Sequence, residues 1–149
     1  MTESRIYPAR PLVAASVAVF RDGKVLLAAR GKPPMDFLFS LPGGMVEPGE
    51  SLGEAALREL REEVGVEAEL LGFVAPVEVI ERDAEGRVRV HVVIAAHAAA
   101  WVSGEPQTGP EAREIRWVAE PDMTALPTTP GLAAVLEAAF ALARQAGRA

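Results

Sequence analysis

The 149-residue chain contains no cysteine, which excludes a disulfide scaffold, a thiolate zinc site and a cysteine nucleophile. It has no long hydrophobic run either. The apolar stretch at residues 12–20 (LVAASVAVF) is well short of the roughly 20 residues that a membrane-spanning helix needs. A basic excess is also missing, because 15 Lys and Arg residues stand against 21 Asp and Glu residues and leave a net charge of −6. We therefore expect neither a nucleic-acid partner nor a membrane partner.

The rest of the composition is typical of an ordinary globular domain, with 50% hydrophobic and 24% charged residues. A chain of this length forms one domain, so residues 1–149 are assigned to a single domain. The N-terminal segment MTESRIYPARP is polar and interrupted by proline, unlike a signal peptide, so we expect a cytoplasmic location. An acidic protein that binds an anion needs something to screen the repulsion, and a divalent cation is the simplest candidate.

Short strands and helices follow one another along the chain. Strands are predicted at residues 12–20, 24–29, 66–82, 87–101 and 113–118. The first two are joined by the turn sequence Asp22-Gly23, and Pro76 is expected at a bulge or break in the third. Helices are predicted at residues 51–64 and 131–145. This order predicts an α/β fold in which one sheet is covered by a helix on each face.

The first helix has the clearest signals. Ser51 is a favourable N-cap, Glu54 three residues later completes a capping box, and Gly65 stands where a left-handed residue ends a helix. At about 100° per residue, one arc of this helix presents three carboxylates and a neighbouring arc can face the core. The carboxylates are Glu59, Glu62 and Glu63, and the apolar residues are Leu57, Leu60 and Val64.

Three carboxylates near a helix C-terminus are electrostatically unfavourable, because they repel one another and oppose the helix dipole. Arg58 can offset part of this through an i,i+4 pair with Glu62. Such a charge run on its own most often marks a solvated helix face. The alternative is a site for a hard divalent cation such as Mg²⁺, which prefers oxygen ligands.

The longer pattern favours the second interpretation. Gly44 is followed after five residues by Glu50, after seven more by Arg58-Glu59-Leu60, and then by Glu62-Glu63 and Gly65-Val66. This segment, residues 44–66, resembles the signature box of the Nudix hydrolases at every fixed position. Leu41-Pro42-Gly43-Gly44 resembles the usual lead-in, and Trp117-Val118 the usual trailer. The resemblance implies an α/β/α sandwich with a mixed sheet and a loop-helix-loop catalytic box.

It also implies a Mg²⁺-dependent pyrophosphohydrolase, with Mn²⁺ as a substitute. Such an enzyme cleaves a nucleoside diphosphate linked to another moiety X by attack of water on phosphorus. The implied catalytic residues are Glu59, Glu62 and Arg58, the last of which orients the carboxylates with Glu50 as its ion-pair partner. The implied metal ligands are Gly44 through its carbonyl oxygen, Glu59, Glu62 and Glu63. Glu114 is added as a further ligand or base.

Several roles remain open between alternatives. The general base is either Glu59 in the box or a later glutamate, Glu111 or Glu114, of which Glu114 has the better spacing from Trp117. Arg30 is expected to bind phosphate, with an exposed strand end as the plainer interpretation. Phe39, like Phe37, either stacks on a nucleotide base or fills the core.

The sequence does not identify the substrate beyond a small nucleotide. ADP-ribose hydrolases of the family carry a proline sixteen residues past the box, where this chain has Arg82, and the only tyrosine, Tyr7, is far from the region in which dinucleoside polyphosphate enzymes carry one. Nucleoside triphosphates, including deoxynucleotides, and nucleotide sugars remain open. The alternatives are an ADP-ribose pyrophosphatase-type activity, a catalytically silent nucleotide-binding module and an accidental match in an acidic protein. By analogy with the family we expect a homodimer.

Overall fold

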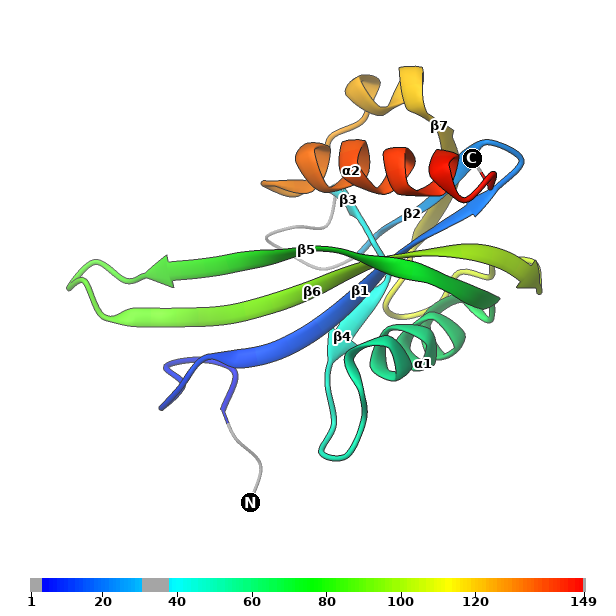
Figure 1. Ribbon diagram of the computed structural model, residues 1–149. Coiled ribbons are helices and arrows are strands. Elements are labelled where there is room, and N and C mark those ends of the chain that lie inside the picture. Colours follow the sequence, from blue (N-terminus) through cyan, green and yellow to red (C-terminus); the bar gives the residue numbers. More distant parts are fainter. Residues whose placement is uncertain (1–3, 31–37, 149) are drawn as a thin grey trace.

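In the computed structural model, a mixed sheet lies between helices α1 (Leu52–Val64) and α2 (Leu132–Gln145) (Figure 1). The structure describes residues 4–30 and 38–148, and within them seven strands form one sheet. The strands are β1 (Leu12–Arg21), β2 (Lys24–Ala29), β3 (Phe39–Ser40), β4 (Gly43–Met45), β5 (Glu67–Arg82), β6 (Val88–Ser103) and β7 (Glu114–Ala119). A short 3₁₀ helix, η1 (Glu120–Ala125), leads from β7 toward α2. The predicted α/β/α sandwich is confirmed.

Strand β1 is the centre of the sheet. It pairs antiparallel with β2 and β4 and parallel with β6, while β5 forms the outer edge beyond β6 and β7 lies beside β2. The β1–β2 hairpin turns at Asp22 and Gly23, which both have left-handed backbone angles (φ 51° and 77°). Two-residue hairpin turns need this conformation, and Asp-Gly supplies it with little strain. The predicted hairpin is therefore confirmed.

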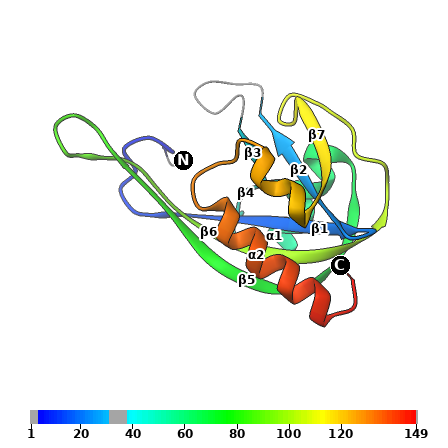
Figure 2. The ribbon, with the colours of Figure 1, turned by 90° about the horizontal axis from the view of Figure 1, so that it is seen from above.

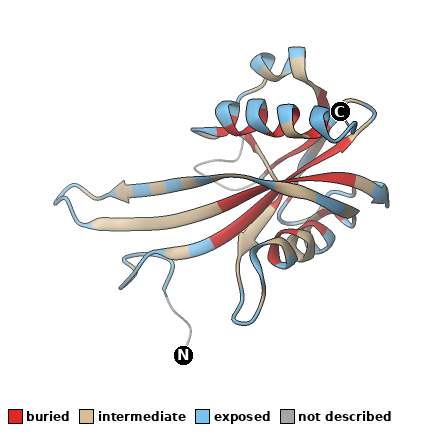
Figure 3. Ribbon diagram, in the orientation of Figure 1, coloured by how far each residue is buried: buried red, intermediate tan, exposed pale blue. Residues whose placement is uncertain are grey.

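The core lies on both faces of the sheet, because successive residues of β1 point to opposite sides. Ala18 and Phe20 face α2, where the Phe20 ring meets the Phe140 ring edge to face with centroids 4.8 Å apart. Val17 and Val19 face α1. Figure 3 shows the buried residues concentrated where the strands cross between the two helices. The central strand is thus packed against a helix on each face of the sheet.

Strands β5 and β6 form a long hairpin that projects beyond both helices (Figures 1 and 2). Pro76 does not break β5: it pairs with Ala95, and the nearest register shift lies between Phe73 and Ala75. Proline is tolerated because β5 is an edge strand, so the missing N–H removes no bond to a further strand. Phe37, which together with Phe39 is a candidate base-stacking residue, lies outside the described residues.

Helix α1 follows its sequence signals closely. Ser51 Oγ accepts a hydrogen bond from the Glu54 main-chain N–H at 3.1 Å, and the Glu54 carboxylate accepts one from the Ser51 N–H at 3.2 Å. Gly65 ends the helix in the left-handed conformation (φ 73°). The side chains buried against the sheet are Ala55, Ala56, Leu60 and Val64, with Leu57 partly buried. None of the described helices is long and apolar enough to cross a bilayer.

Replacing Ser51 by alanine tests the contribution of the capping box. The variant loses the side-chain acceptor for the Glu54 N–H, and we expect its free energy of unfolding to fall by about 1 kcal/mol. Urea denaturation of the two proteins measures this difference. Ser103→Ala, at the exposed end of β6, is the control and should change stability by much less. An equal loss in both variants would contradict a specific role for the cap.

Candidate active site

A cleft of about 590 Å³ opens beside the N-terminal half of β1. Its floor includes Ala14, Ala15 and Ser16, and β4 and α1 form one wall. Because β4 pairs with β1 through Ala15 and Gly44, the loop before α1 is attached directly to the central strand. The start of the box and the middle of its helix therefore face the same space.

The structure brings most of the predicted site residues to this cleft. Those that line it are Gly44, Glu59, Glu62, Glu63 and Arg30. Arg58 lies behind the carboxylates and does not line the cleft. Of the later glutamates, Glu111 lines the cleft and Glu114 does not.

Gly44 and Glu59 are in close contact. A Cβ atom added to Gly44 would lie 2.5 Å from the Glu59 carboxyl carbon and 2.6 Å from one of its oxygens. Real Cβ atoms do not approach other atoms this closely, so only glycine leaves room for the carboxylate. The glycine that begins the box is therefore required by the position of Glu59.

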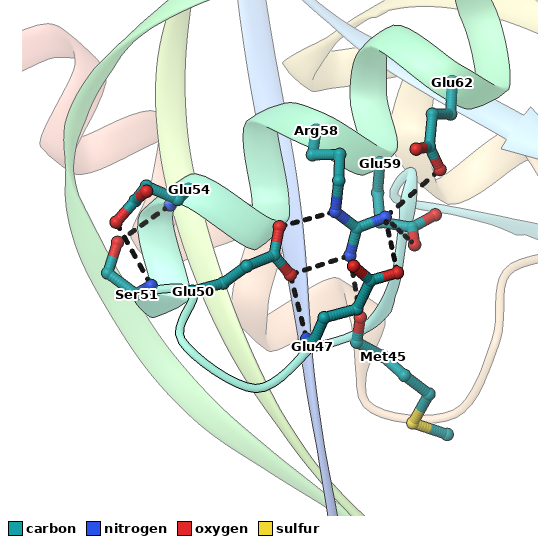
Figure 4. Close-up of polar contacts among 8 residues, drawn as sticks. All are labelled: Met45, Glu47, Glu50, Ser51, Glu54, Arg58, Glu59 and Glu62. Atoms are coloured by element: carbon teal, nitrogen blue, oxygen red, sulfur yellow. Dashed lines mark hydrogen bonds and ion pairs between the residues drawn. The ribbon is translucent and has the colours of Figure 1, made fainter. Parts of the chain in front are cut away.

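Arg58 connects the parts of the box (Figure 4). Its guanidinium donates hydrogen bonds through Nε and Nη2 to the two oxygens of Glu50, and Nη2 also donates to the Met45 carbonyl at 3.0 Å. Nη1 donates to Glu59 at 2.9 Å and to Glu62 at 3.1 Å. The hydrogen bonds from Arg58, and then one from the Glu47 main-chain N–H, hold the pKa of the Glu50 carboxyl below its usual value. Arg58 itself stays charged, because the Glu50 contact raises its pKa despite burial.

Glu63 has the opposite electrostatic environment. Burial, followed by the negative charge of Glu59, raises the pKa of the Glu63 carboxyl to about 8, and Glu111 adds to this effect. A hydrogen bond from the Gly43 main-chain N–H and the charge of Arg30 act against it. The cleft thus concentrates more negative charge than its own cations neutralise.

This donor set fits a hard divalent cation, which takes carboxylate and main-chain carbonyl oxygens. Among the described residues, no three acidic or histidine side chains already stand close enough together to hold an ion. Glu59 and Glu62 instead point to Arg58. The Glu62 side chain is 60% exposed and is therefore free to turn from Arg58 toward the cleft. The excess charge around Glu63 is the observation that favours a cation.

Besides Arg58, two predicted site residues do not line the cleft. Phe39 is 4% exposed and belongs to the core cluster under α2, with the Arg116 guanidinium 5.3 Å from its ring centre. Of the two roles expected for Phe39, base stacking and core filling, its burial agrees with core filling. Glu114 pairs with Arg116 at 3.3 Å on β7. Sequence spacing favoured Glu114 over Glu111, but the loop before β7 instead brings Glu111 to within 3.3 Å of Arg30 at the end of β2.

Comparison with known proteins identifies the family to which this chain belongs. Residues 10–139 match the model of the NUDIX domain. The chain belongs to the NUDIX family. It is a Nudix hydrolase, a member of the enzyme class that acts on pyrophosphate bonds. The convergence of the box residues at one cleft agrees with this assignment.

Relatives within the family carry different substrate names. The Nudix chain is 33% identical over 107 residues to the ADP-ribose pyrophosphatase of Methanocaldococcus jannaschii, covering 72% of this chain but only 61% of that protein. It is 35% identical over 126 residues to the CTP pyrophosphohydrolase of Escherichia coli, covering 82% of this chain and 86% of that protein. The crystal structure of a MutT NUDIX hydrolase from Burkholderia pseudomallei is similar, with a TM-score of 0.69 and 32% identity, covering 87% of this chain and 98% of the other.

Gly44→Ala tests the contact between the first residue of the Nudix box and Glu59 on its helix. The added methyl group displaces the Glu59 carboxylate, and we expect pyrophosphate hydrolysis to slow at least about tenfold, since small misplacements in a site are costly. The melting temperature should change little. Gly109→Ala is the control, because its Cβ would meet only the Glu63 main-chain oxygen at 4.0 Å. Equal activity of Gly44→Ala and the wild type would contradict the prediction.

Glu63→Gln tests the excess of negative charge around the Glu63 carboxyl in the cleft. In the folded protein the Glu63 pKa is raised from the ordinary 4.5 to about 8. The folded state therefore holds this proton more tightly than the unfolded state, and stability is lost as pH rises between these values. Without divalent cations, we expect the variant to melt a few degrees higher than the wild type near pH 8 and at a similar temperature near pH 4.5. Thermal unfolding in EDTA measures both, and a difference that does not grow with pH would contradict the prediction.

Proposed function

We propose that this Nudix hydrolase is a Mg²⁺-dependent pyrophosphohydrolase that cleaves a nucleoside diphosphate linked to another moiety X, with Mn²⁺ as a substitute. The observation that carries the proposal is the convergence of Gly44, Glu59, Glu62 and Glu63 on one cleft in which negative charge exceeds positive charge. A magnesium site of this kind draws its remaining ligands from water and substrate phosphate oxygens.

Each residue then has a distinct task. When bound, Mg²⁺ neutralises phosphate oxygens and makes the attacking water more acidic. Glu59, Glu62 and Glu63 would hold the cation, and the Gly44 carbonyl would be a further ligand. Arg58 is a positioning residue, because its contacts are to carboxylates and to a main-chain carbonyl rather than to the cleft.

Proton transfer from the attacking water needs a carboxylate at the cleft. Glu59 remains our first candidate for this base. Among the later glutamates we propose Glu111 in preference to Glu114, because Glu111 lines the cleft whereas Glu114 pairs with Arg116 on β7. Arg30 is proposed to bind a phosphate oxygen; its present partner, Glu111, lies at 3.3 Å on the surface and is readily exchanged.

The nucleoside part of the substrate is proposed to enter a second cavity of about 380 Å³. This cavity adjoins the cleft and shares with it Ser16, Ser40, Leu41, Val79 and Ile94. Its mostly apolar lining suits a base and a sugar ring. Within this class we propose a nucleoside triphosphate or a nucleotide sugar. An ADP-ribose pyrophosphatase-type activity is the second candidate, favoured by the match to the Methanocaldococcus jannaschii enzyme of that name.

A catalytically silent nucleotide-binding module is the remaining alternative. It is disfavoured because the chain keeps every box carboxylate and the arginine that positions them. A cytoplasmic location and a homodimer remain predictions.

The test is hydrolysis of a substrate panel by the wild type and by Glu59→Gln in the presence of Mg²⁺. The panel contains deoxynucleoside triphosphates, oxidised dGTP, CTP, ADP-ribose, nucleotide sugars and dinucleoside polyphosphates. We expect one compound to be turned over far faster than the others, and Glu59→Gln to lose at least about a hundredfold in kcat, because it lacks a charged group that acts in the transition state. Glu137→Gln, exposed on α2, is the matched control.

The outcomes separate the candidates. Preferred turnover of ADP-ribose would replace our first substrate class with the second. Absence of turnover with Mg²⁺ and with Mn²⁺, together with nucleotide binding in calorimetry, would contradict the enzymatic proposal and favour the silent module. Full activity of a folded Glu59→Gln would contradict the role of Glu59.

A further inference from the structure

Arg5 lines the same cleft as the box carboxylates, although it lies in the N-terminal arm that precedes β1. The NUDIX model matches residues 10–139, so family membership assigns no role to this side chain. Within residues 4–30 and 38–148, no carboxylate forms an ion pair with Arg5. The other arginine lining the cleft, Arg30, is paired with Glu111 at 3.3 Å. Arg5 is therefore a cationic group that has no anionic partner among the described residues, in a cleft rich in carboxylates.

The arm is fixed to the tip of the β5–β6 hairpin through Tyr7. The Tyr7 hydroxyl donates a hydrogen bond to the Asp83 carboxylate at 2.9 Å, and the Tyr7 main-chain N–H donates one to the Arg89 carbonyl at 2.8 Å. The Arg87 guanidinium lies 4.7 Å from the centre of the Tyr7 ring. Figures 1 and 2 show the N-terminal segment beside the end of this hairpin. These contacts hold Tyr7 in place, and they therefore restrict the position of Arg5, two residues earlier in the chain.

The backbone at Tyr7 and the hydrogen bonds of Asp83 also indicate that the arm has a defined position. Tyr7 has a left-handed conformation (φ 52°), which is uncommon for a residue other than glycine, asparagine or aspartate. Asp83 is itself held by main-chain N–H groups of Glu85 and Arg87, at 3.0 Å and 2.9 Å, within the hairpin turn. The acceptor for the tyrosine hydroxyl is thus fixed by the turn before the arm reaches it.

The order of the strands places Arg5 and Arg30 on opposite sides of β1. Arg30 follows the end of β2, whereas the arm contacts β6, and β2 and β6 flank β1 on opposite sides. The floor between them is formed by Ala14, Ala15 and Ser16 of β1. A guanidinium binds phosphate oxygens with two parallel hydrogen bonds, and such charged contacts are stronger than neutral ones. A phosphate chain over the box carboxylates would have an arginine on each side.

We propose that Arg5 binds the phosphate chain of the substrate from the side of the cleft opposite Arg30, and that the contact between Tyr7 and Asp83 holds it there. This inference rests on the proposed function. It adds a binding residue and a positioning pair, Tyr7 with Asp83, that both lie outside the Nudix box.

The first experiment measures binding without turnover. Inorganic tripolyphosphate is titrated in a calorimeter into the wild type and Arg5→Ala, with Ca²⁺, which also takes oxygen ligands, in place of Mg²⁺. We expect Arg5→Ala to weaken the Kd about tenfold or more, and Arg5→Lys to recover part of the loss. The ratio should shrink at high salt, since the contact is electrostatic. Arg148→Ala removes an exposed arginine that does not line the cleft and should bind as the wild type does.

The second experiment tests placement by the tyrosine. Tyr7→Phe loses the hydroxyl that reaches Asp83, and we expect a smaller rise in Kd than for Arg5→Ala. In the Arg5→Ala background the same change should have almost no further effect, because both substitutions act on one interaction. A Tyr7→Phe effect of equal size in both backgrounds would overturn the placement by Tyr7.

The two proposals fail in different ways. Wild-type binding and turnover together with an unchanged Kd in a folded Arg5→Ala would overturn the role of Arg5 and leave the proposed function intact. A wild type that neither binds tripolyphosphate nor hydrolyses any compound of the panel would overturn both.

Discussion

The site depends first on Arg58. Its guanidinium binds Glu50 in the loop before α1, Met45 at the end of β4, and Glu59 and Glu62 on the helix. Without a central cation, Glu59 and Glu62 would repel one another in the C-terminal half of a helix whose dipole already disfavours negative charge there. The planar guanidinium makes five contacts of fixed geometry, which the single ammonium of a lysine does not reproduce. One side chain, 18% exposed, therefore joins strand, loop and helix into a single unit.

This unit is attached to the fold through β4. The pairing of Gly44 with Ala15 brings the loop onto the central strand, and the missing Cβ of Gly44 leaves the space that Glu59 occupies. The same geometry buries Glu63 near Glu59 and raises its pKa, so part of the protein's stability is given up where the carboxylates gather. Sites that concentrate unneutralised charge commonly show this trade between stability and function.

The features that the sequence predicted well are those written in neighbouring residues. The capping box of Ser51 and Glu54, the terminating Gly65 and the Asp22-Gly23 turn all depend on contacts a few positions apart, and each has the expected geometry. Features that depend on distant strands were harder to predict. The effect of Pro76 depends on β5 being an edge strand, and the choice between Glu111 and Glu114 depends on how the loop before β7 meets Arg30. Phe39 has the same apolar character in the core as at a binding site, so only its burial distinguishes the two roles.

The cleft also combines features set by neighbouring residues with features set by segments that are distant in sequence. The carboxylates Glu59, Glu62 and Glu63 come from one helix, so their mutual positions depend on neighbouring residues. Relatives of this chain carry names as different as ADP-ribose pyrophosphatase and CTP pyrophosphohydrolase. The other wall is assembled from the end of β2, the loop before β7, the β5–β6 hairpin and the N-terminal arm. These segments are distant in sequence and meet only because the strand order places β2 and β6 on either side of β1. Residues there are free to change without disturbing Arg58 and its carboxylates. Discrimination between substrates is therefore expected to reside in this wall and in the cavity that adjoins it, rather than in the box carboxylates that we propose to hold the cation.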